Sequence, residues 1–478
     1  MPSTRPLLLH GGTVITMDGT TGVLPAGDVL VRDGRIEAVG ARLDAPAGAR
    51  VIDTTGKIVL PGLVDSHRHT WETLLRGAGV EWTLTDYFGY LVSRFVPLFR
   101  PEDVYAANLL AATESLLDGT TTMADWADAS RTPEHTDAAI QALQDAGIRS
   151  RFVYANIFAS PHIFVPTRRT LGLYERYGST DGRLSMQVAI DPTCQDGLPE
   201  EAAWRFAREH GIPVAAHAGL FGWANETYVK DLHRRGLLDA TNTYVHVVSL
   251  DREAQQMIAD TGGTAVMAGS NFHSGQGYPR ITEFTAMGIP VALASDSGVR
   301  FRRDMFTMMQ LMVSADHVWE HLRYEKPDLS GVVNPVNACR SVDALRCVTV
   351  HGARALGHGD SIGSLTPGKR ADLLVVRPND VASLPYRLDP VAHVVWQCGP
   401  DCVETVLVDG EVVKQDGRLT TGPGLEKARQ LADASREYLI GRIGEEALAE
   451  AVREPATPPG APLRHSFPVF PKPDDPQA

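Results

Sequence analysis

Two histidines separated by one residue, His67 and His69, have a type and spacing that could support metal chemistry. They follow residues 58–64, an apolar run with the composition of a buried strand. Alternate residues of a strand face the same side, so both imidazoles would point the same way, as two ligands of one metal ion must. With 16 histidines in 478 residues, chance alone gives about 0.5 such pairs per chain. The alternative is therefore a surface or hydrogen-bonded pair.

Three further polar residues occupy similar positions in apolar runs. His217 ends residues 214–217, His246 lies within 244–247, and Asp296 follows 291–295. Each alone is typical of a capping group or a hydrogen-bonded core residue. Together they fall at the carboxyl ends of successive predicted strands, where barrel enzymes carry their catalytic groups. Three imidazoles and one carboxylate would suit Zn²⁺ or Fe²⁺ and leave a position for water.

The elements that must position these residues alternate between helix and strand. In each case an apolar strand-like run follows a helix that ends at glycine, which is a common helix terminator. Repeated units of this kind over roughly 300 residues indicate an α/β barrel or a doubly wound sheet. Neither a GxGxxG nor a Walker A loop is present to favour a nucleotide-binding sheet. The predicted helices are residues 104–117, 136–146, 199–210 and 281–287.

The two ends of the chain differ from this middle. Residues 1–57 and 371–420 read as β structure with Asp-Gly hairpin turns, and they predict one small β-sandwich domain built from both ends. Residues 58–370 would form the barrel. Within residues 421–478, positions 425–453 predict one or two amphipathic helices, and positions 454–478 form a proline-rich arm.

Composition narrows the classes of function. The net charge of −13 argues against a nucleic-acid or anionic-membrane partner, because both favour a basic face. Five scattered cysteines resemble no disulfide framework, and the apolar run at residues 7–9 is too short for a signal peptide or a membrane span. We therefore expect a cytoplasmic protein that acts on a small molecule. Residues 425–453 and the proline-rich arm could clasp a second subunit, so a homo-oligomer, a dimer or higher, is predicted.

Residues 60–69, LPGLVDSHRH, resemble the first-strand signature of the amidohydrolase superfamily. The branch most resembled contains cytosine, guanine and S-adenosylhomocysteine deaminases and triazine hydrolases. The resemblance covers about residues 6 to 415 and implies a (β/α)₈ TIM-like barrel. Supporting motifs are LLRG at 74–77, GTTT at 119–122, SN at 270–271 and IGSLTPGKRADL at 362–373.

The resemblance also implies roles for the residues at the predicted strand ends. His67, His69, His217 and Asp296 would bind the metal, with His246 close to the metal-bound water and the substrate. Residues 185–191 contain no lysine that could bridge two metals, so one divalent ion is predicted, Zn²⁺ before Fe²⁺.

The activity implied is hydrolysis of a carbon–nitrogen bond in an amide, lactam, amidine or heteroaromatic amine. The metal would activate water, while His246 and Asp296 act as catalytic residues that accept and shuttle its proton. Alternatives are a hydrolase that releases another group such as halide, or a lyase or decarboxylase on the same scaffold. A non-catalytic binding relative is disfavoured, because it would not need the complete ligand set.

One position departs from the deaminase pattern. In that branch the fifth-strand histidine is commonly followed three residues later by a glutamate that protonates a ring nitrogen. Here Leu220 stands at that position and cannot transfer a proton, and Glu226 reads as a solvated loop or helix residue. His273 or Glu72 could supply the proton instead, although either can be read as an ordinary loop residue.

The loop after the first barrel strand is rich in aromatic residues that could stack a planar ligand or pack beneath the loop. Trp126, after the second strand, could likewise stack a ligand or pack beneath a loop. Arg300, Arg302 and Arg303 could bind a substrate carboxylate or belong to a solvated face. The candidate substrate contacts are Trp71, Glu72, Trp82, Asn271 and His273.

Overall fold

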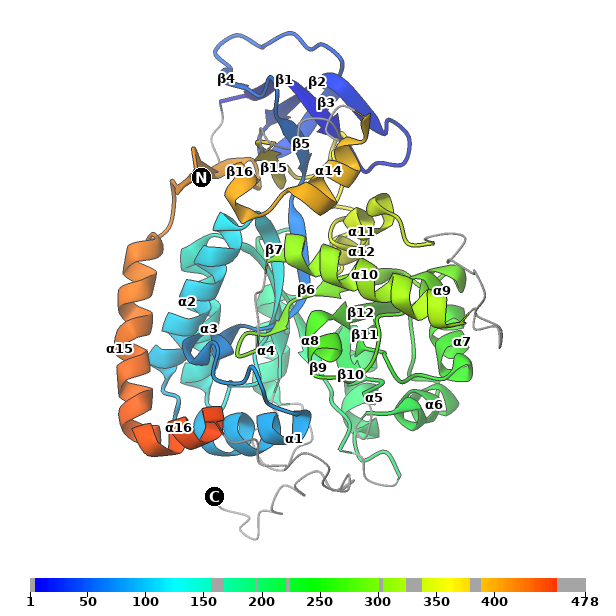
Figure 1. The fold of residues 1–478 in the computed structure, drawn as a ribbon, viewed down its shortest axis with the longest axis vertical. Coiled ribbons are helices and arrows are strands. Elements are labelled where there is room, and N and C mark those ends of the chain that lie inside the picture. Colours follow the sequence, from blue (N-terminus) through cyan, green and yellow to red (C-terminus); the bar gives the residue numbers. More distant parts are fainter. Residues whose placement is uncertain are drawn as a thin grey trace, which may run out of the picture.

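The computed structural model describes residues 5–155, 167–193, 197–220, 224–300, 304–323, 338–378 and 388–453 (Figure 1). Within these residues the chain forms a helix-wrapped parallel barrel and a separate sheet. The first predicted alternative, a barrel, is therefore confirmed over a doubly wound sheet.

The barrel sheet has the strand order β13-β12-β11-β10-β9-β8-β7-β6-β14, and every pair in it is parallel. β13 and β14 are two pieces of one strand that is interrupted at Ser295. Asp65 holds the interruption, because its carboxylate accepts hydrogen bonds from the backbone N–H (2.9 Å) and the hydroxyl of Ser295. The strands are β6 Leu63–His69, β7 Thr120–Trp126, β8 Arg149–Tyr154, β9 Leu184–Ala189, β10 Val214–Ala218, β11 Thr243–His246, β12 Thr264–Ala268, β13 Val291–Ala294 and β14 Asp296–Ser297.

Helices surround this sheet on its outer face (Figure 1). The four helices that the sequence predicted are α2, α3, α5 and α9; each ends within one residue of its predicted end and begins within about three residues of its predicted start. For example, α3 ends at Gly147, whose φ of 78° is the left-handed conformation that glycine adopts without strain. The helices before β13 are α2 Pro101–Leu117, α3 Pro133–Ala146, α4 Arg168–Tyr177, α5 Glu201–Glu209, α6 Glu226–Arg234, α7 Arg252–Thr261, α8 Gly269–His273 and α9 Ile281–Ala286. Those after β14 are α10 Met305–Arg323, α11 Ser341–Cys347, α12 Val350–Ala355 and α14 Pro390–Gln397.

The loop between β6 and α2 forms short helices of its own. They are η1 Thr70–Leu75, α1 Leu84–Asp86, η2 Tyr87–Phe95 and η3 Val96–Leu98. Their aromatic side chains are largely buried, so this loop is a packed cover at the carboxyl ends of the strands.

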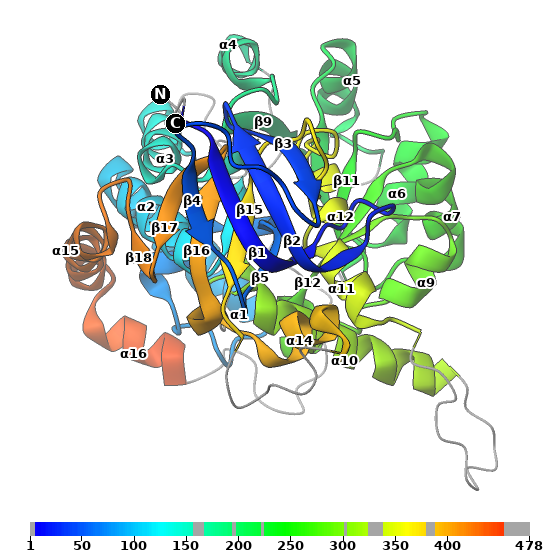
Figure 2. The same ribbon diagram turned by 90° about the horizontal axis from the view of Figure 1, so that it is seen from above.

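The second sheet joins the two ends of the chain, as Figure 2 shows from above. Its order is β18-β17-β16-β15-β5-β1-β2-β3, with β4 paired to β1. β5, which the sequence placed at the start of the barrel, pairs with β15 and β1 in this sheet, so the chain enters the barrel at Gly62. The strands are β1 Leu7–Ile15, β2 Val23–Arg32, β3 Arg35–Gly40, β4 Arg50–Asp53, β5 Ile58–Pro61, β15 Leu373–Val376, β16 Val403–Val408, β17 Glu411–Gln415 and β18 Arg418–Leu419.

One buried and one partly exposed ion pair connect this sheet to the barrel. Nε of Arg149 lies 2.7 Å from a carboxylate oxygen of Asp372, and Arg183 pairs with Glu411 at 2.7 Å. Arg149 is the first residue of β8, so the contact is at the amino ends of the barrel strands. The sheet therefore supports the end of the barrel opposite to its catalytic face.

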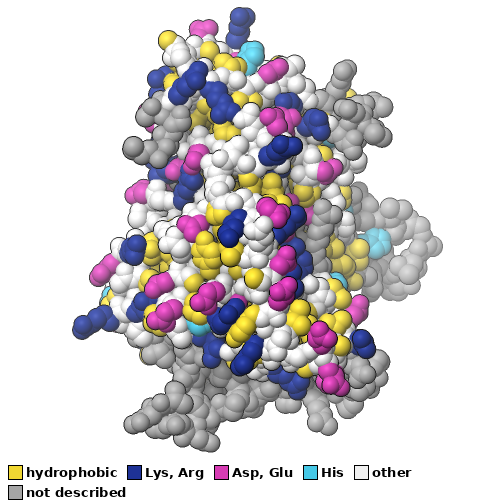
Figure 3. Space-filling view, turned by 90° about the vertical axis from the view of Figure 1, so that its left-hand side faces the viewer, with side chains coloured by type: hydrophobic (Ala, Val, Ile, Leu, Met, Phe, Trp, Pro, Cys, Tyr) yellow, Lys and Arg dark blue, Asp and Glu magenta, His cyan; other side chains and the backbone are white. Residues whose placement is uncertain are grey.

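The predicted C-terminal helices are α15 Leu425–Ile443 and α16 Glu445–Arg453. α15 runs beside α2, where the Arg100 guanidinium lies 3.5 Å from the centre of the Tyr438 ring. Figure 3 shows this side of the molecule, on which acidic and basic side chains are interspersed. The proline-rich arm, 454–478, lies outside the described residues. None of the helices described is both long and apolar enough to cross a bilayer.

Candidate metal centre

His67 and His69 project from the same face of β6, as the strand period requires. Their ring centres are 4.8 Å apart, and both side chains are buried. The intervening Arg68 points the other way and donates a hydrogen bond from Nη1 to Ser115 Oγ in α2 at 2.7 Å. Because side chains alternate between the two faces of β6, the two imidazoles point into the barrel and the guanidinium points outward.

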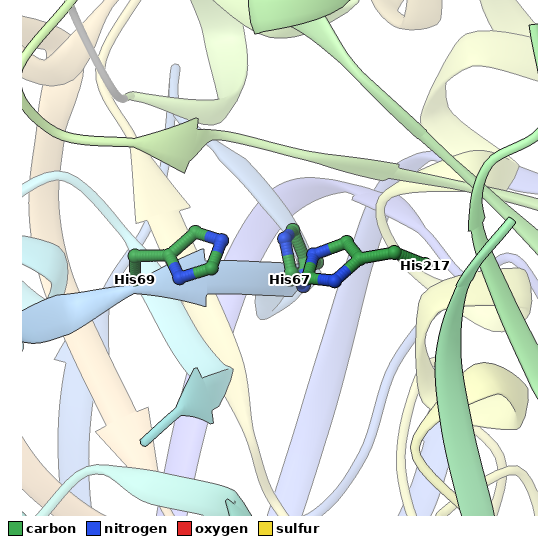
Figure 4. Close-up of side chains that lie close together, drawn as sticks. All are labelled: His67, His69 and His217. Atoms are coloured by element: carbon green, nitrogen blue, oxygen red, sulfur yellow. The ribbon is translucent and has the colours of Figure 1, made fainter. Parts of the chain in front are cut away.

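His217 of β10 and Asp296 of β14 complete a compact group around these rings. Figure 4 shows the imidazoles of His67, His69 and His217 converging from two strands. Nε2 of His67 lies 3.1 Å from Oδ1 of Asp296, and Nε2 of His69 lies 3.3 Å from the same oxygen. Ligands of one tetrahedral zinc ion are about 3.4 Å apart. The spacing and the donor set, imidazole nitrogens with one carboxylate, therefore fit a borderline divalent metal.

Two aspartates that the sequence analysis did not single out hold the imidazoles in place. Oδ2 of Asp128 lies 3.1 Å from Nδ1 of His69, and Oδ1 of Asp191 lies 3.0 Å from Nδ1 of His217. Each bond on Nδ1 leaves Nε2 free to face the centre, which is the arrangement of metal-binding histidines. Their positions in the sequence could have identified these aspartates, because each lies two residues after a barrel strand, Asp128 after β7 and Asp191 after β9.

His246 is the last residue of β11 and stands beside this group. Its ring centre lies 5.0 Å from that of His217, and its Nδ1–H donates to Oδ1 of Asn271 at 2.8 Å. Burial lowers the pKa of His246 to about 4, so the ring is neutral at pH 7 and its Nε2 can accept a proton. Its φ of 82° is strained for a non-glycine residue, as is the φ of 60° at Asp296. Such strain concentrates at functional sites.

The charges of the group are set by these contacts. Burial holds the pKa of His67 well below its usual value, so this ring is neutral. Burial also disfavours the charge of Asp296, but hydrogen bonds from His67 and His69 outweigh it and keep the pKa of Asp296 well below its usual range. Burial disfavours the His69 cation, yet Asp128 raises the pKa of His69 well above normal. A metal must therefore displace a proton from His69.

A partly open pocket adjoins the group, and His69, His217, His246 and Asp296 are among its lining residues. Leu220 is among the residues that line this pocket. Where the deaminase branch commonly has a proton-donating glutamate, this chain therefore presents an apolar side chain. Glu226, at the start of α6, is not in the lining. The apolar lining residues are Leu84, Tyr87, Phe88, Val92 and Leu220, and the polar ones beyond the metal group and its partners are Ser270, Ser274, Gln276, Ser297 and Arg300.

The predicted metal ligands lie together, whereas only some of the predicted substrate contacts line the pocket. Asn271 lines the pocket and holds His246. Trp71 and Trp82 pack beneath the loop, where Trp71 donates to Asp128 and Trp82 donates to the carbonyl of Ala451 in α16 at 2.6 Å. His273 is exposed, with Nε2 2.8 Å from the carbonyl oxygen of Val80. The structure thus places both tryptophans and His273 outside the pocket lining.

Trp126 packs against the metal group and not against the ligand space. Its ring centre lies 4.7 Å from that of His67 and 4.3 Å from that of His217. Arg300 does line the pocket, whereas Arg302 and Arg303 fall outside the described residues.

Glu72 lies behind the pocket wall. Its two carboxylate oxygens accept hydrogen bonds from the hydroxyls of Tyr87 and Ser297, each at 2.6 Å, and both of these residues line the pocket. Burial raises the pKa of Glu72 to about 7, against the opposing attraction of His69. Glu72 is therefore connected to the pocket through two hydroxyl groups.

Comparison with known proteins agrees with this geometry. Residues 58–413 match the model of the amidohydrolase family. The chain belongs to this family, and the predicted barrel fold, family and enzyme class are confirmed.

Its relatives include a 5-methylthioadenosine/S-adenosylhomocysteine deaminase of Acetivibrio thermocellus, 27% identical over 87% of this chain and 95% of the relative. The corresponding deaminase of Symbiobacterium thermophilum is 29% identical over 86% and 94%.

Solved structures share the fold. An adenosine deaminase from Xanthomonas campestris with bound zinc has a TM-score of 0.74 at 23% identity, covering 91% of this chain and 100% of the neighbour. A mutant atrazine chlorohydrolase from Arthrobacter aurescens, complexed with zinc and atraton, has a TM-score of 0.76 at 24% identity, covering 90% and 100%.

Proposed function

We propose that this protein is a hydrolase that uses one divalent metal ion to cleave a carbon–nitrogen bond of a small molecule. The observation that carries the proposal is the convergence of three imidazoles and one carboxylate beside a neutral His246, at the open end of a barrel. Zinc is the expected ion, with Fe²⁺ second, because both accept this donor set. The zinc named in two of the structural neighbours supports that order.

The four ligands would be His67, His69, His217 and Asp296. A divalent ion held there would lower the pKa of water and so supply a nucleophile near neutral pH. His246, whose Nδ1–H is held by Asn271, would use its Nε2 to hold a proton during the reaction and pass it to the leaving group. Asp296 would steer the same proton through the carboxylate oxygen that accepts from Ser270.

A heteroaromatic substrate also needs a proton on a ring nitrogen. The side chain of Leu220 cannot donate that proton. We propose that Glu72 supplies it through the hydroxyl of Tyr87 or Ser297. The relay requires only that each hydroxyl accept one proton from the carboxyl group and donate its own toward the pocket. A carboxyl group with a pKa of about 7 is suited to proton exchange at neutral pH.

The expected substrates are heteroaromatic amines, lactams, amidines or amides, since deaminases are among the relatives. One observation favours a second candidate. Because Leu220 presents hydrocarbon in the pocket, a substrate that needs no ring protonation would react without Glu72, and release of a halide is the alternative chemistry.

One experiment separates these reactions. The purified protein is assayed for ammonia with aminopurines, aminopyrimidines and aminotriazines, and for chloride with chlorotriazines, after its metal content is measured. Ammonia release with about one metal ion per chain supports the proposal. Chloride release alone favours the second candidate. Less than about half an equivalent of metal, with no turnover, contradicts both.

Three further proposals follow the sequence. The domain division is retained, with residues 58–370 as the barrel except for the strand that pairs in the small sheet. We also propose a homo-oligomer, tested by light scattering, and a cytoplasmic location without a nucleic-acid partner. The net charge of −13 supports the last point, because nucleic-acid binding favours a basic face.

A further inference from the structure

Arg300 is a buried cation in the wall of the pocket. Its exposed fraction is 3%, and it follows β14, the strand that carries Asp296. Nη1 donates to the carbonyl of Trp82 at 2.7 Å, and the guanidinium carbon lies 5.6 Å from the centre of the Tyr87 ring. These contacts orient the guanidinium but bring it no negative charge.

The charge of Arg300 is not matched by a close carboxylate. In the described part of the chain, no acidic side chain lies within ion-pair distance of it. Burial lowers the pKa of Arg300, and the more distant Asp296 and Glu72 only partly oppose this. Arg149 shows the contrast, because it is equally buried but pairs with Asp372, which raises its pKa.

A buried arginine without a carboxylate is not by itself a ligand site. Arg68 donates to Ser115, and Arg151 donates to Gln187 at 3.2 Å, and neither arginine faces the pocket. Arg300 differs because it is the one lysine or arginine among the described residues that line the pocket. A guanidinium has five N–H donors, of which the Trp82 carbonyl takes one, so the side chain retains the fork that binds carboxylates with two hydrogen bonds.

The neighbours of Arg300 complete the description of the ligand. The pocket that Arg300 and the metal group share also has apolar lining, in which Tyr87, Phe88 and Val92 could cover a ring or a short chain. The proposed metal would engage the charge of Asp296. Of the described residues, Glu72 and Asp86 would still act on Arg300, but neither lies at ion-pair distance, so the guanidinium lacks a close counter-charge among them. A substrate that carried its own anion would provide one.

We propose that Arg300 binds a carboxylate of the substrate, and that the substrate therefore joins a hydrolysable nitrogen group to a carboxylate across a small apolar body. This rests on the proposed function, because the reacting group must lie at the metal. Arg300 is thus a specificity-determining residue and not part of the proton transfer.

The test uses matched ligands on the metal-loaded full-length protein. Benzohydroxamate chelates metals through its hydroxamate, and its 3- and 4-carboxy derivatives are compared with the corresponding carboxamides by calorimetry. In the wild type, one carboxylate isomer is expected to bind about tenfold or more tightly than its carboxamide. In R300Q that ratio should fall to near one, while the affinity for the carboxamide stays within about twofold.

Controls keep the result interpretable. R280Q removes an arginine that pairs with Glu283 outside the pocket lining and should preserve the ratio. If R300Q fails to fold, R300K retains the charge but not the fork, and a reduced ratio supports the proposal.

Three results would overturn it: equal binding of carboxylates and carboxamides by the wild type, an unchanged ratio in R300Q, or an unchanged ratio in R300K. Failure of the proposed function is distinguishable, because even unsubstituted benzohydroxamate would then not bind, and both proposals would be wrong.

Discussion

Asp191 offers a sharp test of the metal centre, because it acts on the proposed ligand His217 without facing the ion itself. One carboxylate oxygen accepts two hydrogen bonds of 3.0 Å, from the backbone N–H and from Nδ1–H of His217. It therefore fixes both the tautomer and the orientation of the ring. Its charge also makes the imidazole a stronger donor to a metal.

Asp191→Asn preserves the shape and one acceptor oxygen but removes the charge. Exchanging a charge-assisted hydrogen bond for a neutral one costs about 1 to 1.5 kcal/mol. We therefore expect zinc to bind about tenfold more weakly, at the lower end of the roughly 10- to 100-fold range for such partners. Asp191→Ala also leaves both donors of His217 without this acceptor, so its loss should be larger, about 100-fold.

The assay is competition for zinc against a chromophoric chelator at fixed pH, with circular dichroism to confirm folding. Asp251→Asn is the matched control, because Asp251 caps α7 and pairs with Lys230 away from the pocket. Its zinc affinity should equal that of the wild type. Wild-type affinity in both Asp191 variants would refute the assignment of His217 as a ligand held by Asp191.

Three other predictions test the same site. His246→Ala should reduce turnover by about 10²- to 10⁴-fold while metal analysis still finds the ion bound; loss of the metal would instead make His246 a ligand. Because Asp128 raises the pKa of His69, protons compete with the metal, so affinity should fall as the pH is lowered through that raised pKa, by up to about tenfold per pH unit; a zinc affinity that is constant between pH 8 and pH 6 would contradict this. Glu72→Gln keeps hydrogen bonds to Tyr87 and Ser297 but cannot release a proton, so deamination should slow by about 10²-fold or more with zinc retained, and an unchanged rate would exclude the proposed relay.

Local pattern was sufficient for much of the fold. The helix–glycine–strand joints depend on backbone preferences that act within a few residues, so α3, α5 and α9 lie close to their predicted positions. The boundary between the small sheet and the barrel, near residue 58, could not be predicted from such local patterns. β5 and β6 are consecutive apolar runs, and pairing with β1 and with β15, the latter more than 300 residues away, assigns β5 to the small sheet.

The substrate contacts were the least predictable part. Trp71 and Trp82 have the composition of a stacking surface, yet each uses its indole N–H to brace the loop. A sequence does not specify which side of a loop an aromatic ring packs against, because the partner lies on a distant element. For Trp82 that partner is Ala451, on a helix near the end of the described chain.

The sequence by itself determined the type of centre, because His67 and His69 are placed together by the period of a single strand. The tertiary structure decided which groups surround it. Asp128, Asp191 and Arg300 lie on different βα units, and only closure of the barrel brings the carboxyl ends of those strands to one point. That closure is a long-range packing outcome, so the candidate metal ligands could be proposed from the sequence, whereas their hydrogen-bond partners and the pocket wall could not.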